Sequence, residues 1–204
     1  MSKQSTQVTF FDGKRSFADV PITDAGISTT EFLEASEALV MLFDVIGGTA
    51  FSLVKSDMRT NIKKIRDRQL GHLEQSATLQ ILVEHENATE KKRVATEGFL
   101  WLARGLQFTA AGLRKNIDDK QQELGVSFSK AYEETLRKHH GMLVRPLISV
   151  ALKSTPYRKD FYKKLGQDQD LVEKQLIEWL NALENIVSIV MKYFEDNKVY
   201  TKGM

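Results

Sequence analysis

Three polar side chains recur at helical spacing within the segment VKSDMRTNIKKI, namely Asp57, Asn61 and Lys64. A helix turns by about 100° per residue, so offsets of four and seven return to nearly the same azimuth and the three side chains share one stripe. A carboxylate accepts hydrogen bonds, an amide donates and accepts them, and an ammonium donates them. Together they suit a ligand rich in hydroxyl groups, such as a sugar. The spacing alone fits a solvated helix face equally well.

Two further motifs could contribute to a site. Trp101 lies in FLWLARGLQF, where an indole is either a core residue or a flat platform for a ligand. His139 and His140 are adjacent, and on a helix they would point about 100° apart, so one is expected to be exposed and the other half-buried or buried. A hydrolase using Asp57 and His140 is a weak alternative, because no recognised nucleophile motif accompanies them.

Composition limits the possible functions. The chain has 204 residues, 42% of them hydrophobic, no cysteine and a formal net charge of +2. This predicts one domain, residues 1–204, and excludes disulfides and cysteine-bound metals. The histidines lack metal-site spacing, so we expect no metal or cofactor. Basic runs lack interleaved aromatics, which argues against a nucleic-acid partner. No signal peptide or bilayer-length apolar run is found, so a soluble cytoplasmic protein is expected.

Apolar residues recur at helical spacing along most of the chain, which predicts an all-α fold. Ser28 and Glu31 form a capping box before a first helix that ends at Gly47-Gly48. Pro146 is expected to bend and break the helix in which it lies, and the least organised parts are expected to be the two chain ends and residues 118–125. The other helices are expected at about 51–71, 78–86, 96–117, 127–153 and from 170 onward.

The run FDVIGGTAFSLVKSDMRTNIKKI, together with WLARGL, KAYEETLRKHHG and TPYRKDF, resembles the glycolipid transfer protein family, and within it the fungal heterokaryon-incompatibility members. The match extends from about residue 29 to residue 194. It implies a single-domain, two-layer helical sandwich that encloses an apolar lipid pocket. It also implies that Asp57, Asn61 and Lys64 bind the first sugar, that Trp101 stacks under its ring, and that Asp57 and His140 bind the ceramide amide.

The ligand implied by this resemblance has long apolar chains. A ceramide carries roughly 30 methylene groups at about 0.8 kcal/mol each, so its chains disfavour water by about 24 kcal/mol. The pocket must therefore be lined by apolar side chains, each of which also fits a plain core position. The candidates are Phe43, Phe51, Val54, Phe108, Leu136, Leu147, Leu152, Phe161 and Leu183.

Membrane docking is the last feature that the resemblance addresses. Met142 stands where the animal pattern has tryptophan, and Lys153 stands where tyrosine is familiar. Interfacial aromatics anchor proteins to bilayers, so their replacement weakens that anchor. Leu143 remains apolar, while Arg145 and Lys153 add positive charge. We therefore expect docking that depends on anionic lipid.

These observations favour a non-enzymatic carrier that moves neutral glycosylceramides between membranes. The expected protein is a monomer that contacts membrane surfaces transiently. Two alternatives remain open. A sensor or adaptor could use the same site to report glycolipid levels. A ceramide-1-phosphate carrier belongs to a related branch of the superfamily, which has cationic residues where this chain has Asn61 and Trp101.

Overall fold

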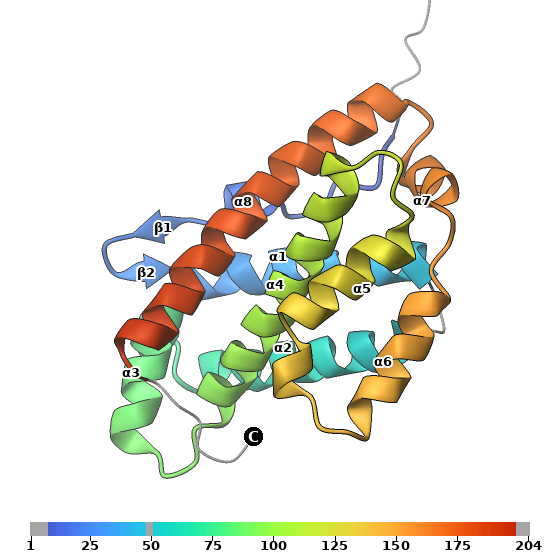
Figure 1. The fold of residues 1–204 in the computed structure, drawn as a ribbon. Helices are drawn as coiled ribbons and strands as arrows, with labels where there is room; N and C mark the ends of the chain where they lie inside the picture. The colour runs from blue at the N-terminus through green and yellow to red at the C-terminus, as the bar shows by residue number, and fades with distance from the viewer. Residues whose placement is uncertain (1–7, 48–50, 199–204) are drawn as a thin grey trace, which may run out of the picture.

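Helices form nearly all of the chain in the computed structural model, which describes residues 8–47 and 51–198 (Figure 1). The all-α prediction is confirmed. The long helices are α1 (Thr29–Gly47), α2 (Ser52–Gly71), α3 (Leu79–Thr89), α4 (Val94–Asp118), α5 (Leu124–Glu134), α6 (Val144–Lys153), α7 (Arg158–Leu165) and α8 (Gln169–Asp196). Short 3-10 turns lie at Phe17–Asp19, Glu74–Ser76 and Arg137–His139, and a small antiparallel pair joins β1 (Ile22–Thr23) to β2 (Gly26–Ile27).

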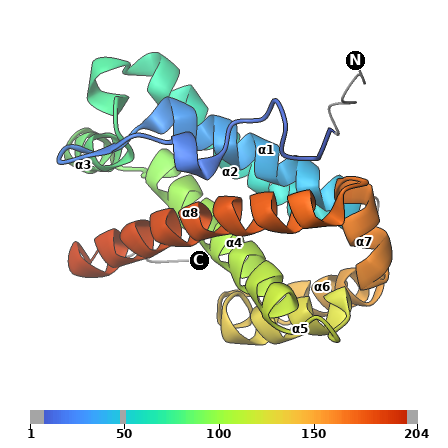
Figure 2. The same cartoon turned by 90° about the horizontal axis from the view of Figure 1, so that it is seen from above.

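The helices form two layers around one apolar core. Helices α1 and α2 lie side by side in one layer, and α4, α5 and α8 lie in the layer facing them (Figures 1 and 2). Helix α4 is central because it packs on α2, α5 and α8. The largest side chains that are fully buried are phenylalanines drawn from both layers, among them Phe32, Phe43, Phe99, Phe108 and Phe128.

The crossing of α2 and α4 is unusually close at Gly98. A Cβ atom at this position would lie 3.0 Å from the Lys64 Cβ and 3.1 Å from the Asn61 carbonyl oxygen. A residue with a Cβ atom would therefore require the Lys64 stem or the Asn61 backbone to shift by a few tenths of an ångström. Glycine usually lowers the stability of a helix interior, but here it allows the polar stripe of α2 to reach α4.

The start of the described chain is more organised than the sequence analysis predicted. Phe17 is buried and packs edge-on against Phe32 and Trp179. The Phe10 backbone N–H donates to the Leu165 carbonyl oxygen at 2.7 Å, which ties the segment to α7. The prediction failed here because these partners are far away in sequence. Residues 1–7 and 199–204 lie outside the described residues, as does Gly48 of the predicted helix end.

A helix over 127–153 with a break at Pro146 was predicted, but the interruption lies earlier in the chain. The chain instead forms α5, a 3-10 turn and α6, and the interruption covers residues 135–143. Pro146 lies in the first turn of α6, where its missing N–H leaves no intrahelical bond unmade. Ser127 is a buried residue within α5, and its hydroxyl accepts from the Asn116 Nδ2 at 3.1 Å. Helix α8 begins near the expected position and is capped by Asp168, whose carboxylate accepts from the Leu171 N–H.

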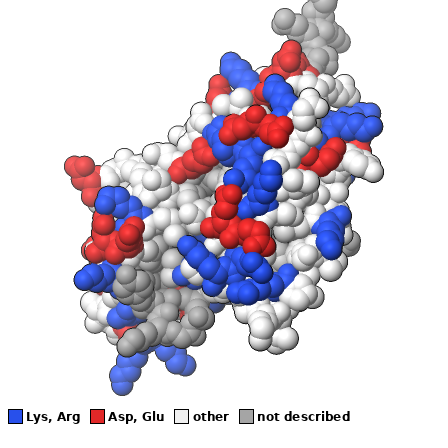
Figure 3. Space-filling view, viewed as in Figure 1, with Lys and Arg blue, Asp and Glu red and all other residues white. Residues whose placement is uncertain are grey.

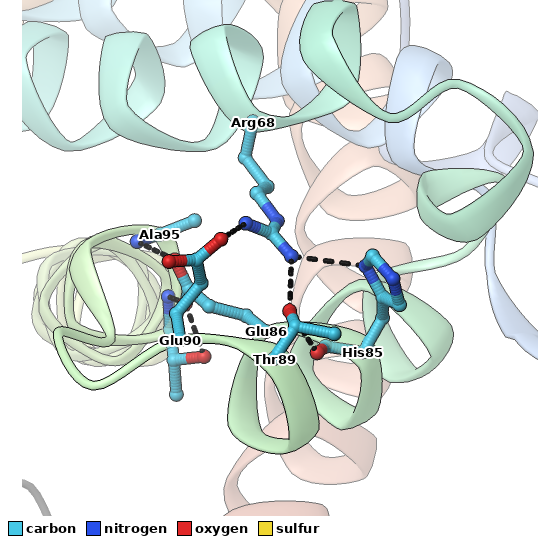
Figure 4. Close-up of polar contacts among 7 residues, drawn as sticks. Arg68, His85, Glu86, Thr89, Glu90 and Ala95 are labelled. Atoms are coloured by element: carbon cyan, nitrogen blue, oxygen red, sulfur yellow. Dashed lines mark hydrogen bonds and ion pairs between the residues drawn. The ribbon is translucent and has the colours of Figure 1, made fainter.

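A buried polar cluster joins α2, α3 and α4 (Figure 4). The Glu86 carboxylate, only 3% exposed, accepts from the backbone N–H groups of Ala95 (2.9 Å) and Thr96 (2.7 Å) and from the Thr96 hydroxyl. Because the first amides of a helix lack intrahelical partners, a carboxylate placed there also favours the helix dipole. Arg68 donates to His85, Thr89 and Glu90 from the α2 side.

None of the described helices is long and apolar enough to cross a membrane.

The Glu86 contacts predict a large effect on stability. Replacing Glu86 with alanine leaves two buried backbone donors without acceptors, so the free energy of unfolding should fall by about 3 kcal/mol. Urea denaturation followed by circular dichroism measures this loss. Glu84→Ala on the exposed side of the same helix is the matched control and should change stability by less than about 0.5 kcal/mol. Equal losses in the two variants would contradict the role assigned to Glu86.

Candidate functional site

A cavity of about 370 Å³ lies between α2, α4 and α6 and brings together every polar residue predicted for the site. Asp57, Asn61 and Lys64 come from α2, Trp101 from α4, and His140 from the connection before α6. The remaining lining residues are Leu53, Val54, Met58, Glu97, Gly105, Phe108, Leu136, Val144 and Ile148. A cavity of similar volume beside the N-terminal segment contains none of the predicted site residues.

The α2 stripe has a graded exposure. Asn61 is only 2% exposed, and its Nδ2 donates to the Asp57 Oδ2 at 3.2 Å. Asp57 itself is reached by solvent at the rim. The surrounding protein nevertheless displaces enough water to raise the pKa of the Asp57 carboxyl, an effect that Lys64 partly opposes. The hydrogen bond from the Asn61 Nδ2 to Asp57 uses the amide as a donor. The side-chain Oδ1 of Asn61 can then act as an acceptor for a ligand.

Lys64 is half-buried and forms no ion pair within the part of the chain that the structure describes. The aliphatic stem of Lys64 packs against Gly98 of α4, at the crossing of α2 and α4. Packing of the aliphatic stem in this way leaves the ammonium group near the cavity. Lys64 therefore offers three donors to a ligand at this position.

Trp101 supplies the aromatic part of the site. Its indole is half-buried, and the guanidinium of Arg104 lies over the ring at 4.9 Å from the centroid. The His140 ring lies offset from the indole and nearly parallel to it, with centroids 5.9 Å apart and 17° between the planes. Burial lowers the pKa of Arg104, and this side chain does not line the cavity. The charged residues that line the cavity with Trp101 are Asp57, Lys64 and Glu97, and no arginine is among the described lining residues.

His140 is held by two neighbours. Its Nδ1 lies 3.1 Å from the Tyr132 hydroxyl, and its carbonyl oxygen accepts from the Arg145 Nε at 2.8 Å. Burial raises the pKa of Tyr132, which keeps the phenol protonated, and burial followed by Arg145 lowers the pKa of His140, which keeps the imidazole neutral. A neutral imidazole carries one ring proton, so either the Tyr132 hydroxyl donates to Nδ1 and the proton lies on Nε2, or Nδ1–H donates to the Tyr132 oxygen.

The two histidines differ from the helical expectation, since both are half-buried. His139 ends a 3-10 turn and His140 has an extended backbone, so the 100° rule does not apply to them. His139 lies edge-on to Trp101 with centroids 6.3 Å apart and does not line the cavity. Burial, reinforced by Arg104, lowers the pKa of His139 to about 4.

The predicted apolar lining is divided between the cavity, the core and the surface. Val54, Phe108 and Leu136 line the cavity. Phe43, Phe51, Leu152, Phe161 and Leu183 are buried in the core and do not line it. Leu147 is 57% exposed, which corrects its assignment, because α6 starts at Val144 and so turns Leu147 outward. Met58, Gly105, Val144 and Ile148 were missed, although Met58 lies one residue beyond Asp57 and carried an apolar periodicity signal.

The surface beside the cavity is apolar. Met142 and Leu143 are 84% and 90% exposed, and Leu147 and Val150 continue this surface along α6. Figure 3 shows an uncharged area over the lower end of α6. Over α8, α4 and α5, in contrast, acidic and basic residues intermix. Lys153 is exposed at the far end of α6, and Arg145 is half-buried against the His140 carbonyl. We call Met142, Leu143, Leu147 and Val150 the α6 outer surface.

Sequence comparison finds close relatives of this chain. The family model described as glycolipid transfer protein matches residues 27–167. A glycolipid transfer protein from Aureobasidium melanogenum is 58% identical over 183 residues, covering 89% of this chain and 90% of that protein. The human pleckstrin homology domain-containing family A member 8 is 33% identical over 92% of this chain, which spans only 38% of that longer protein.

Solved structures agree with these relatives and confirm the predicted fold and its fungal resemblance. The crystal structure of HET-C2, a fungal glycolipid transfer protein, superposes with a TM-score of 0.86 at 49% identity, covering 89% of this chain and 94% of that one. A structure describing how FAPP2 selects simple glycosphingolipids also gives a TM-score of 0.86, at 31% identity, covering 97% of this chain and 100% of that one. This protein belongs to the glycolipid transfer protein family.

Proposed function

We propose that this protein binds neutral glycosylceramides and carries them between membranes without making or breaking covalent bonds. One observation carries the proposal: one cavity is lined both by polar groups able to hydrogen-bond a sugar and by apolar side chains. Asp57, Asn61 and Lys64 lie beside Trp101, while Val54, Phe108 and Leu136 form apolar wall. A glycosylceramide has the same division into a polyhydroxyl group and apolar chains. The similarity to proteins described as glycolipid transfer proteins supports this assignment.

The ceramide amide lies between those two parts and loses water on binding. An unpaired amide would cost a few kcal/mol, about 1–3 on mutational evidence. In the proposed complex, the Asp57 carboxylate accepts from the amide N–H, and the His140 Nε2–H donates to the amide carbonyl. Tyr132 is compatible with this arrangement because its hydroxyl can donate to Nδ1, which leaves the ring proton on Nε2.

The sugar is proposed to stack on the cavity-facing side of Trp101. A pyranose presents C–H groups that pack on an indole face. Arg104 covers the ring as a cation and helps to hold it in place. Asn61 and Lys64 then reach the hydroxyl groups at the edge of the sugar, as does the second oxygen of Asp57.

The apolar chains need more room than the described cavity offers. A volume of about 370 Å³ is near the lower end of pockets for drug-sized ligands, whereas a ceramide has two long chains. Helix α6 packs chiefly against α5, and its Val144 and Ile148 close the cavity opposite α2. We therefore propose that chains enter as α6 and α2 separate. Phe43, Phe51, Leu152, Phe161 and Leu183 stay candidates for the widened pocket.

A phosphate headgroup fits this cavity poorly. Phosphate recognition favours several cations, preferably arginine forks. Lys64 is the one cationic side chain among the described lining residues, and Arg104 is engaged at Trp101 instead. The neutral Asn61 and Trp101 occupy the neighbouring positions. A neutral sugar is therefore preferred to ceramide-1-phosphate.

The α6 outer surface is proposed to contact the membrane transiently while the protein acts as a monomer. Leu143, Leu147 and Val150 are spaced by four and three residues, so they point to one side of the helix. Lys153 adds positive charge at the end of that surface, where an anionic bilayer would attract it.

Asp57→Val tests the proposed function directly. Loss of a charged acceptor costs about 2 kcal/mol, so transfer of galactosylceramide between phosphatidylcholine vesicles should fall roughly 30-fold. Labelled lipid should arrive in the acceptor vesicles chemically intact with the wild type. Asp67→Val, on the exposed side of the same helix, is the matched control and should transfer normally. Unchanged transfer by Asp57→Val, or no transfer by the wild type, would refute the proposal.

Binding should also depend on pH through Asp57. The carboxylate is the stronger acceptor when ionised, and its pKa in the free protein lies above the ordinary value of 3.8. Affinity for galactosylceramide should therefore be constant at neutral pH and fall as the pH decreases through that raised pKa. The affinity of Asp57→Asn should lose this pH dependence. It should keep any pH dependence that comes from His139, whose pKa is about 4. Parallel pH profiles for the two proteins would exclude Asp57 as the titrating group.

Vesicle binding tests the proposed docking surface. The wild type should partition more strongly to vesicles containing phosphatidylserine than to neutral ones, and added salt should reduce the difference. Leu143→Ser should weaken binding to both vesicle types about tenfold, whereas Lys153→Gln should weaken binding only to anionic vesicles, by about fivefold. Equal partitioning of the wild type to both compositions would contradict the dependence on anionic lipid.

A further inference from the structure

We propose that Glu97 is a specificity-determining residue that excludes glycolipids with a negatively charged sugar. The inference rests on the proposed function and extends it, because it concerns which headgroups the same site rejects. The ligand class that it predicts is a ceramide with an uncharged sugar, as opposed to one whose sugar carries a sulfate.

Position is the first evidence. Glu97 lines the cavity together with Trp101, which follows it by four residues on α4. Residues four apart lie on the same helix face, so the carboxylate borders the indole on which the sugar is proposed to stack. The next residue, Gly98, contacts the Lys64 stem, which places Glu97 at the crossing of α2 and α4.

Charge is the second evidence. The lining residues that are charged at neutral pH are Asp57, Lys64 and Glu97, which gives two carboxylates against one ammonium. Glu97 is half-buried and has no ion pair or side-chain hydrogen bond among the described residues. Its charge is therefore not neutralised by a neighbouring side chain. The acceptor oxygens of Glu97 remain available to sugar hydroxyl groups.

The two headgroups should therefore be treated differently. A hydroxyl group can donate to the Glu97 carboxylate, whereas a sulfate has only acceptor oxygens and a negative charge. In a partly buried cavity the repulsion between like charges is stronger than in bulk water. Lys64 cannot offset it fully because Asp57 shares the same ammonium. The cavity therefore disfavours the sulfated sugar while it accepts the neutral one.

The experiment compares transfer of two labelled lipids from phosphatidylcholine vesicles, galactosylceramide and the same lipid with a sulfate on its galactose, at equal low mole fraction. The wild type should move the sulfated lipid at least about tenfold more slowly. Glu97→Gln keeps a hydrogen-bond acceptor but removes the charge, so it should reduce that ratio at least about fivefold. Glu74→Gln removes the same charge from an exposed residue outside the cavity and should leave the ratio unchanged.

Salt provides a measurement that needs no variant. If the discrimination is electrostatic, the ratio of the two wild-type rates should shrink as ionic strength rises. The inference is overturned if the wild type transfers both lipids equally, or if the ratio survives Glu97→Gln in a protein that unfolds at the normal temperature. Failure of the wild type to transfer galactosylceramide would instead refute the proposed function on which the inference rests.

Discussion

The close contact between α2 and α4 at Gly98 is the constraint on which the site depends. With no side chain at this position, the Asn61 carbonyl and the Lys64 stem lie directly against α4. Asn61 is then buried, and its amide is oriented by the hydrogen bond to Asp57. Trp101 is one turn farther along α4, so the stripe and the indole face the same cavity. Two rigid helices thus fix these groups before any ligand binds, which lowers the entropic cost of binding.

The electrostatics of the site follow from partial burial. Protein around Asp57 raises the pKa of its carboxyl, and the charge of Lys64 partly opposes that rise. Burial also favours the neutral forms of His140 and Tyr132, and in the proposed tautomer the imidazole proton lies on Nε2. The cavity therefore offers a carboxylate acceptor and an N–H donor at fixed positions. An amide group needs both partners at once, whereas a sugar alone would not require the histidine.

Local periodicity predicted the parts of the site that depend on a single helix. The Asp57, Asn61 and Lys64 stripe follows from helix geometry alone, because any α-helix over 52–71 places them together. The positions of Trp101 and His140 relative to that stripe came from the family resemblance, since no local rule relates α4 to the connection before α6. The comparisons confirm the family and the fold. The binding roles of these residues stay predictions.

Tertiary packing decided what the sequence could not predict. The order of the N-terminal segment depends on the contact of Phe17 with Trp179, far away in the chain. The outward position of Leu147 depends on where α6 begins, and that start is set by a connection whose backbone is partly extended. Val144 and Ile148 were missed for the same reason, because a helix continuing unbroken from Ser127 would have given them a different azimuth.

Helix α6 joins the two halves of the proposed mechanism. Val144 and Ile148 form the inner side that closes the cavity, and Leu143, Leu147 and Val150 form the outer side that faces away from it. A bilayer that takes up the outer side therefore contacts the same short helix that limits the volume available to the lipid chains. Movement of α6 toward the bilayer would enlarge the cavity at the moment when apolar chains are available to fill it. Away from a membrane, separation of α6 from α2 would expose apolar surface to water at about 25 cal/mol per Å², which favours the closed cavity of about 370 Å³.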